Sequence, residues 1–411
     1  MTAPPRAGWL FLATLVLATA MGPMAMQLLV PSLPAVAADF EVPLALANLN
    51  ISVAMVVIAL STLIYGPLSD RLGRRPVMLA GIGMFLTGTA ISAFAPNVGM
   101  LIFGRAVQAV GGAAGLVVAR AVVRDIYGPD RSASVIATLT VSMMAAPMIA
   151  VVLGGVFTDF FGWRFNFYFA FAVGAAVAAL MATALRETRR GEPQTGSAAL
   201  EMLHGYRHLF GSKVFAGYAL QGSFGSGTFF AFMGAAPYVM VEILDRPATE
   251  FGVYFAMVTV IFMAANFVGG RLSLRFGTAR MVLAGGIWSL VAALLGVIWL
   301  ATGELGVFML FATSGAISIG NGVAMPSTQA GALNVMPHYA GTASGAAAFI
   351  QTMMGAVFAQ VSGSLVGGSA MPLFVTMLVA TGIGFFFSTW PTLFRDRTPA
   401  AFVPHEAAGK D

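Results

Sequence analysis

The sequence contains no cysteine and little charge. Because none of the 411 residues is a cysteine, the chain can form no disulfide and offers no thiolate as a metal ligand or nucleophile. Charged residues make up only 9% of the chain, compared with about 25% in a soluble domain. Hydrophobic residues make up 58%, so the sequence predicts a polytopic membrane protein.

The hydrophobic residues form long runs separated by short polar or turn-forming breaks. A helix needs about 20 apolar residues to cross a bilayer, and such runs lie at about 9–31, 48–66, 77–95, 99–121, 133–156, 163–185, 213–237, 251–270, 281–301, 306–326, 341–366 and 371–391. Runs this long exclude a transmembrane barrel, whose strands alternate in polarity. We expect the first run to be a spanning helix rather than a cleaved signal, because further runs follow it instead of a soluble domain.

The basic residues predict the orientation of these helices. If the N-terminus is cytoplasmic, only Arg105, Arg164 and Arg246 of the 21 lysines and arginines lie away from the cytoplasmic loops and tails. Short cytoplasmic loops retain positive charge, so both termini are predicted to be cytoplasmic. The net charge of +5 follows from this bias, and its spread over many short loops excludes a nucleic-acid partner.

A long polar interval near the midpoint divides the chain into two halves. We predict a six-helix bundle at 1–190, a cytoplasmic linker at 191–212, a second six-helix bundle at 213–395 and a cytoplasmic tail at 396–411. The linker stretch ALEMLHGYRHLF fits either a short amphipathic helix on the membrane surface or a simple hinge. The predicted fold is all-α, with twelve transmembrane helices in two six-helix halves.

One short motif occurs twice. GPLSDRLGRR at 66–75 returns in altered form as GRLSLRFGTA at 270–279. The identical positions are Gly66, Leu68, Ser69, Arg71 and Gly73, matched by Gly270, Leu272, Ser273, Arg275 and Gly277. Both copies follow the second predicted helix of their half, which indicates that the halves arose by duplication. Asp70 has no counterpart in the second copy, where Leu274 occupies the corresponding position.

The first copy resembles the signature of the major facilitator superfamily, G-x-L-x-D-R-x-G-R-[RK], through Gly66, Leu68, Asp70, Arg71, Gly73, Arg74 and Arg75. The stretches LVPSLPAVAADF (29–40), RAVQAVGGAAGLVVARAVVRDIYG (105–128) and LRETRR (185–190) resemble the bicyclomycin and chloramphenicol resistance branch, Bcr/CflA. The resemblance covers essentially the whole chain. It implies a multidrug efflux antiporter of the bacterial inner membrane that works by alternating access, with a proton gradient and no cofactor.

Two departures from the branch leave a second function open. Gln27 stands where the first helix usually carries an aspartate, and Ala150-Val151 replace the Gly-Pro or Ala-Pro pair of the fifth helix. Proton-coupled or facilitated uptake of a small organic solute is therefore the alternative to export. No acid lies deep in a predicted span, which argues against permanently cationic substrates. We expect neutral or anionic amphiphiles.

The charged motif has two interpretations. It is either an ordinary positive turn at the membrane surface or a gate. Glycines allow a tight turn, and Asp70 suits the positive N-terminal end of a neighbouring helix. The resemblance implies that this neighbour is the eleventh helix, starting near Gly341, and that the contact closes the cytoplasmic side. We expect the contact in the outward-open state and its loss when that side opens. The gating residues are Gly66, Asp70, Arg71, Gly73, Arg74 and Arg75.

Arg105 lies about 8 Å inside a predicted span, at 1.5 Å per residue. An ionisable residue at such depth indicates function, although the side chain is long enough to reach the interface. Helices 1, 4, 7 and 10 line the central cavity in the family, with contributions from 2, 5, 8 and 11. The predicted cavity residues are Met24, Gln27, Arg105, Gln108, Met144, Gln221, Phe229, Tyr238, Asn266, Asn321 and Gln351. The candidates for proton coupling are Arg105, Asp125 and Asp159, the two acids otherwise forming structural ion pairs.

The remaining classes of function receive little support from the residues. The four histidines lie outside the spans or at their ends, and no deep acids are paired. We therefore expect no enzyme and no metal site, and a channel or receptor is a weak alternative to a transporter. The expected partners are a small amphiphilic substrate and the lipid bilayer, with the protein acting as a monomer.

Overall fold

The computed structural model describes residues 9–188, 211–335 and 340–394, with some side chains between 128 and 144 and those of 340–342 left undescribed. In these ranges the chain is helical, apart from turns and a single bridge between Gly367 and Ser369. The predicted linker falls mostly on residues 189–210, and the tail on 395–411, so both lie outside the described residues.

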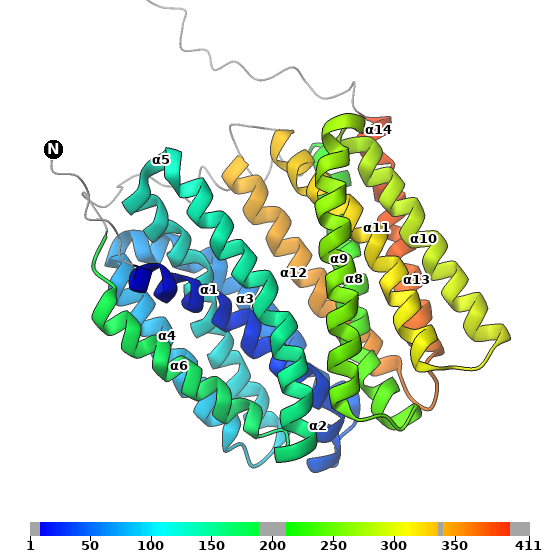
Figure 1. Cartoon of the computed structure of the whole chain (residues 1–411), viewed down its shortest axis with the longest axis horizontal. Helices are drawn as coiled ribbons and strands as arrows, with labels where there is room; N and C mark the ends of the chain where they lie inside the picture. Colours follow the sequence, from blue (N-terminus) through cyan, green and yellow to red (C-terminus); the bar gives the residue numbers. More distant parts are fainter. Residues whose placement is uncertain (1–8, 189–210, 336–339, 395–411) are drawn as a thin grey trace, which may run out of the picture.

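Helices cover nearly all of the predicted spans (Figure 1). In chain order they are α1 (Trp9–Leu29), continued by a 3₁₀ turn and α2 (Leu33–Asp39), α3 (Leu44–Leu72), α4 (Arg74–Ala93), α5 (Val98–Phe161), α6 (Phe165–Ala184), α8 (Lys213–Tyr238), continued by a π-helical turn (Val239–Ile243), α9 (Ala248–Phe276), α10 (Thr278–Thr302), α11 (Val307–Asn334), α12 (Ala340–Leu365), α13 (Met371–Ser388) and α14 (Trp390–Leu393).

The helix α5 contains two predicted spans rather than one. A straight helix of 64 residues would be about 96 Å long, far more than a bilayer needs. Its two ends nevertheless lie together, because Arg164 just beyond one end donates to the carbonyl of Ala95 just before the other, at 3.4 Å. The chain therefore turns back within α5. With α5 as two spans, the described helices fit twelve crossings: eleven are long and apolar enough, and Ala145–Phe161 is a shorter apolar segment.

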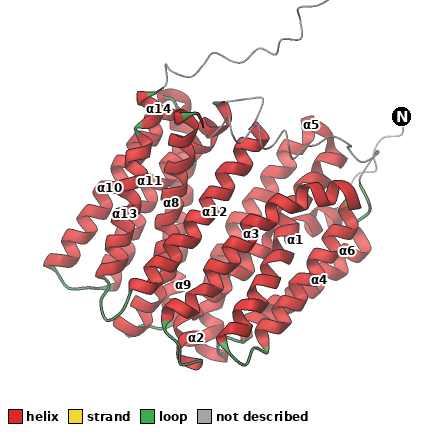
Figure 2. Ribbon diagram, turned by 180° about the vertical axis from the view of Figure 1, so that it is seen from behind, coloured by secondary structure: helices red, strands yellow, loops and turns green. Residues whose placement is uncertain are grey.

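The helices form two groups that meet along two pairs. Helices α1, α3, α4, α5 and α6 pack together, and α8 to α14 form the second group (Figures 1 and 2). Across the boundary, α3 packs against α12 and α5 packs against α9. The size of the side chains between two helices limits how closely their backbones approach, and glycine allows the closest approach. A Cβ on Gly155 or Gly252 would strike the backbone of the opposite group.

Six hydrogen bonds between described residues join the two groups at one end, which we call the sealed end. Asn48 donates to the carbonyl of Gly234 at 2.7 Å, and Gln360 donates to that of Ala45 at 2.8 Å. Ser52 donates to Gln360 at 2.9 Å. Asp159 accepts the other three bonds, which are described below. Figure 1 shows the groups converging at this end, near α2, and separating toward the top.

The opposite end, which we call the motif end, carries both copies of the repeated motif. The sequence placed the first copy in a loop between spans, but only Gly73 separates α3 from α4. Gly73 has φ 99° and Gly277 has φ 83°, a conformation that side chains other than glycine rarely adopt. The motif thus comprises the last turns of α3 and the start of α4. The helices extend further toward this end than the predicted spans did.

Candidate functional site

A cavity of about 300 Å³ lies between the two helix groups. It is lined from α1, α5, α8, α9, α11, α12 and α13 by Gln27, Met143, Pro147, Met148, Gln221, Gly222, Gly225, Ser226, Thr228, Phe229, Phe230, Phe255, Val258, Thr259, Phe262, Met263, Ser314, Ile317, Ser318, Asn321, Met325, Gln351 and Met377. None of these described lining residues carries a charge. Methionine and phenylalanine adapt to apolar ligands of varied shape, while a few amides can orient them.

Most of the amides in the cavity already have partners. Gln221 accepts from Thr328 at 2.6 Å, Gln351 donates to Ser226, and Asn321 donates to the carbonyl of Gly225 at 3.3 Å. Gln27 differs, because the residue is 7% exposed and its Oε1 has no hydrogen-bond partner among the described residues. A buried acceptor without a donor is costly. Gln27 is therefore a ready acceptor for an N–H or O–H group in the cavity.

The structure brings together about half of the predicted cavity residues. Gln27, Gln221, Phe229, Asn321 and Gln351 line it, whereas Met24, Arg105, Gln108, Tyr238 and Asn266 do not. Met24 packs into a small cluster around Leu28, and Tyr238 packs against the large core cluster to which both groups contribute. The side chain of Met144 lies outside the described residues.

Sequence reasoning missed most of the apolar lining. These residues come mainly from α5 and α9, among them Met143, Pro147, Met148, Phe255, Phe262 and Met263. Both helices are apolar around much of their circumference, so periodicity does not reveal which face meets the cavity. The only sign of this cavity face in the sequence was the presence of Met143, Pro147 and Met148 in the second span of α5, after the chain turns back.

Arg105 lies behind the cavity, inside the first helix group. Its side chain is 2% exposed. It donates to the carbonyl of Ala25 at 3.2 Å and to Oε1 of Gln108, which in turn donates to Thr89 at 2.7 Å. Gln27 is not among the acceptors of its hydrogen bonds. Within the described part of the chain, Nε of Arg105 has no hydrogen-bond partner, and no carboxylate forms an ion pair with this guanidinium.

The charged motif forms a network within the first group. Arg74 pairs with Asp70 at 2.5 Å and with Asp125 at 3.0 Å. It also donates to Ser69 at 2.7 Å. Its side chain is 12% exposed, whereas that of Asp70 is 59% exposed. Asp125, a predicted coupling residue, is thus held by Arg74 and by Thr188, whose hydroxyl lies at 3.3 Å.

Glu187 closes the same network from beyond α6. Its carboxylate accepts from the backbone N–H of Arg74 at 2.9 Å and of Arg75 at 3.1 Å. These are the first free N–H groups of α4, where a negative charge is stabilising. Arg75 donates to the carbonyl of Ala182 at 3.1 Å. The LRETRR stretch was noticed only as a family resemblance, although its acid caps a neighbouring helix.

Asp159, the other predicted coupling acid, caps a helix of the opposite group. Its carboxylate accepts from the N–H of Ala248 at 3.1 Å, from the N–H of Thr249 at 2.7 Å and from the hydroxyl of Thr249 at 2.6 Å. These atoms begin α9. Arg164, five residues further along the chain, pairs with Asp39 at 2.7 Å instead. Asp159 is therefore a latch between the two groups at the sealed end.

Comparison with known proteins identifies the architecture. The sequence matches the Major Facilitator Superfamily over residues 15–360. The chain belongs to this superfamily. It is 28% identical over 395 residues to the bicyclomycin resistance protein homolog of Haemophilus influenzae, covering 93% of this chain and 97% of that protein. It is 29% identical over 373 residues to multidrug resistance protein D of Escherichia coli, covering 89% and 92%.

A solved structure of another transporter shows the same fold. The inward-facing, occupied bacterial homolog of the human lysosomal transporter Spinster matches with a TM-score of 0.76 at 16% identity, over 96% of this chain and 98% of that one. The expected all-helical fold, the superfamily and the resemblance to bicyclomycin and multidrug resistance proteins are confirmed. The chain is a multi-pass membrane transporter of the superfamily, a class that is distinct from enzymes.

Proposed function

We propose that this transporter exports neutral or anionic amphiphilic small molecules by alternating access. The observation that carries the proposal is the uncharged cavity between two helix groups that are joined at the sealed end. An uncharged, Met- and Phe-rich lining favours apolar molecules without permanent positive charge. Gln27 offers one hydrogen-bond acceptor to orient them. The resistance names of the relatives support the same direction of transport.

The proposed orientation places the motif end in the cytoplasm. The positive-inside rule supports it, since Arg71, Arg74 and Arg75 lie at this end. The protein would then reside in the bacterial inner membrane, with both termini cytoplasmic and the sealed end outside. The residues 1–190 and 213–395 act as the two moving halves, connected by the linker. We propose a monomer in the bilayer that needs no cofactor.

The mechanism requires the two ends to open in turn. In the present state the outer side is closed by Asp159, Asn48 and Gln360, and substrate reaches the cavity from the cytoplasm. Export needs these contacts to break while the motif end closes. The two states need differ by only a few kcal/mol. When Asp159 leaves the start of α9, the backbone N–H groups of Ala248 and Thr249 can bind water at the membrane surface instead. The exchange of partners keeps the barrier to opening of the outer side low.

Proton antiport is the proposed source of energy. Antiport requires protonation to favour the state that opens to the cytoplasm. Protonation of Asp159 would have the opposite effect, because a neutral carboxyl is a weaker acceptor for the start of α9. Asp159 therefore serves as a latch. Asp125 and Arg105 remain the proposed coupling residues.

Expression in a drug-hypersensitive host tests the direction of transport. Export predicts resistance and lower cellular accumulation of chloramphenicol, and both effects should disappear when the proton gradient is collapsed. Higher accumulation than in the host alone would show uptake instead. Transport that is independent of the pH gradient would remove the antiport proposal while leaving export intact.

A disulfide tests the latch directly, because the chain contains no natural cysteine. Asp159→Cys with Thr249→Cys should crosslink under oxidation, fix the outer side closed and stop export. A reductant should restore export. A fully active crosslinked protein would contradict the proposed movement. Asp159→Cys alone is the control.

A further inference from the structure

We propose that Arg120 selects substrates with an anionic group, by holding that group at the mouth of the central cavity while the apolar body fills the cavity. The inference rests on the proposed function and names the substrate class more closely. Arg120 belongs to the first span of α5, yet neither the motif network nor the Arg105 cluster uses it. Its side chain is exposed.

The position of Arg120 relative to the cavity is fixed by one contact. Its Nη2 lies 3.6 Å from the sulfur of Met143, and Met143 lines the cavity. The returning half of α5 contributes Met143, Pro147 and Met148 to the lining. Of these, Met143 lies nearest to the turn in α5 and hence to the motif end. Arg120 therefore stands at the rim through which substrate enters.

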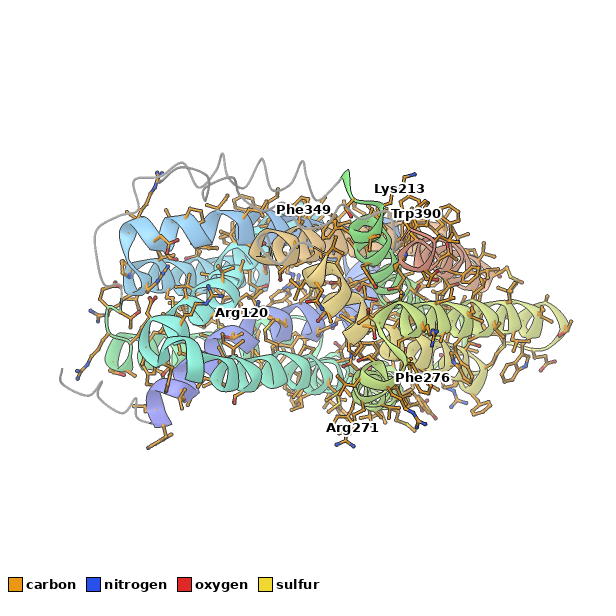
Figure 3. All side chains as sticks on the ribbon, turned by 90° about the horizontal axis from the view of Figure 1, so that it is seen from above. Arg120, Lys213, Arg271, Phe276, Phe349 and Trp390 are labelled. Carbon is orange, nitrogen blue, oxygen red and sulfur yellow. The ribbon has the colours of Figure 1, made fainter. Side chains whose placement is uncertain are left out.

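Among the described residues, Arg120 has no strong hydrogen-bond acceptor for its charge. A thioether sulfur is a weak acceptor, and none of the ion pairs among the described residues includes Arg120. In Figure 3, which looks down on the motif end, Arg120 lies among the helices of the first group, while Lys213 and Arg271 point outward at the edges. An outward-pointing arginine would serve a lipid headgroup, whereas Arg120 lies against Met143, a residue of the cavity lining.

The physical consequence is selection by charge. Guanidinium binds carboxylate, sulfonate or phosphate by two parallel hydrogen bonds. A cation beside an uncharged, mostly apolar cavity also draws anions toward it. A cationic amphiphile of equal shape is repelled at the same point. The cavity thus selects the apolar body, and Arg120 selects the sign of the polar end.

A matched pair of ligands tests the inference. Binding of 4-octylbenzoate and 4-octylbenzamide to the purified full chain is measured by calorimetry at pH 7.5, where the benzoate is ionised. We expect the wild type to bind the benzoate about tenfold more tightly, which is the lower end of what charge-assisted hydrogen bonds contribute at a solvated site. Arg120→Gln should equalise the two ligands, and Arg120→Lys should retain part of the difference. Arg124→Gln, one helical turn away, should leave it unchanged.

Different outcomes overturn different statements. An unchanged benzoate preference in Arg120→Gln, or equal binding of both ligands by the wild type, would overturn the role of Arg120 even if chloramphenicol export is intact. If the wild type did not export chloramphenicol, the proposed function would be overturned. The ligand comparison would still decide the role of Arg120.

The lipid headgroup is the other source of an anion. The same measurement is therefore made in maltoside micelles and in phospholipid nanodiscs. Equal preference in both supports the solute as the anion. A preference that vanishes in the phospholipid would assign Arg120 to a headgroup phosphate and overturn the inference.

Discussion

The two copies of the repeated motif share a backbone but differ in charge. In each, the glycine N–H donates to a serine carbonyl, from Gly73 to Ser69 at 3.2 Å and from Gly277 to Ser273 at 2.9 Å. The first copy adds Asp70 and Arg74, together with Asp125 and Glu187, the carboxylates that bind Arg74. In the second copy Leu274 replaces Asp70 and is 90% exposed. The glycine and serine thus suffice for the helix turn, and the charges of the first copy serve another purpose.

The largest expected effect is that of alanine at the first glycine. Gly73→Ala places a Cβ in a backbone region that side chains avoid, at a cost of about 1–3 kcal/mol. The same Cβ would meet the Glu187 carboxylate at 2.6 Å and displace it from the start of α4, costing about 1 kcal/mol more. Gly277→Ala meets no atom within 4 Å and should lose only the backbone part. Thermal unfolding in detergent measures both, and equal losses would contradict the cap.

Arg74→Ala should have the next largest effect. Asp125 would lose its ion pair in a site where its side chain is 25% exposed. Removal of one partner from a half-buried pair should cost about 2 kcal/mol, between the values for exposed and buried pairs. The matched control is Thr278→Ala in the second copy, where the hydroxyl shares one hydrogen bond with Tyr218 at 3.2 Å. Its expected loss is about 0.5–1 kcal/mol. Chemical unfolding measures both, and comparable losses would show that the network contributes little.

The sequence predicted the helices better than it predicted their contacts. Long apolar runs define the spans because a bilayer requires them. The cavity glutamines were found because polar residues stand out in such runs, as with Gln27 and Gln351. Met143 and Phe255 were missed because apolar residues on the cavity face and the lipid face look alike. The partner of Asp159 could not be predicted, since it lies on a helix of the other half and depends on how the halves pack.

Asp70→Asn separates stability from transport. Asp70 is 59% exposed, and an exposed pair with Arg74 is worth less than about 1 kcal/mol, so unfolding should hardly change. Export should fall several-fold, because Asp70 is expected to contact the start of α12 when the motif end closes. That contact is tested by oxidative crosslinking of Asp70→Cys with Ser344→Cys. The crosslink between residues 70 and 344 should form in higher yield when the outer side can open than when a disulfide between residues 159 and 249 holds that side closed. Equal yields in the two cases would contradict the proposed gate.

The smallest expected effect comes from transferring the charges to the second copy. Leu274→Asp with Thr278→Arg recreates the pair of Asp70 and Arg74 on the same backbone. No aspartate or glutamate occurs between Glu304 and Asp396, so the part of α11 that corresponds to Asp125 offers no carboxylate to the new arginine. The exposed pair alone should change unfolding by less than about 0.5 kcal/mol and leave export at its wild-type rate. If the double variant instead slowed export as much as Asp70→Asn, the second motif would also be a moving contact. The asymmetry between the halves would then lie in the choice of residues rather than in the mechanism.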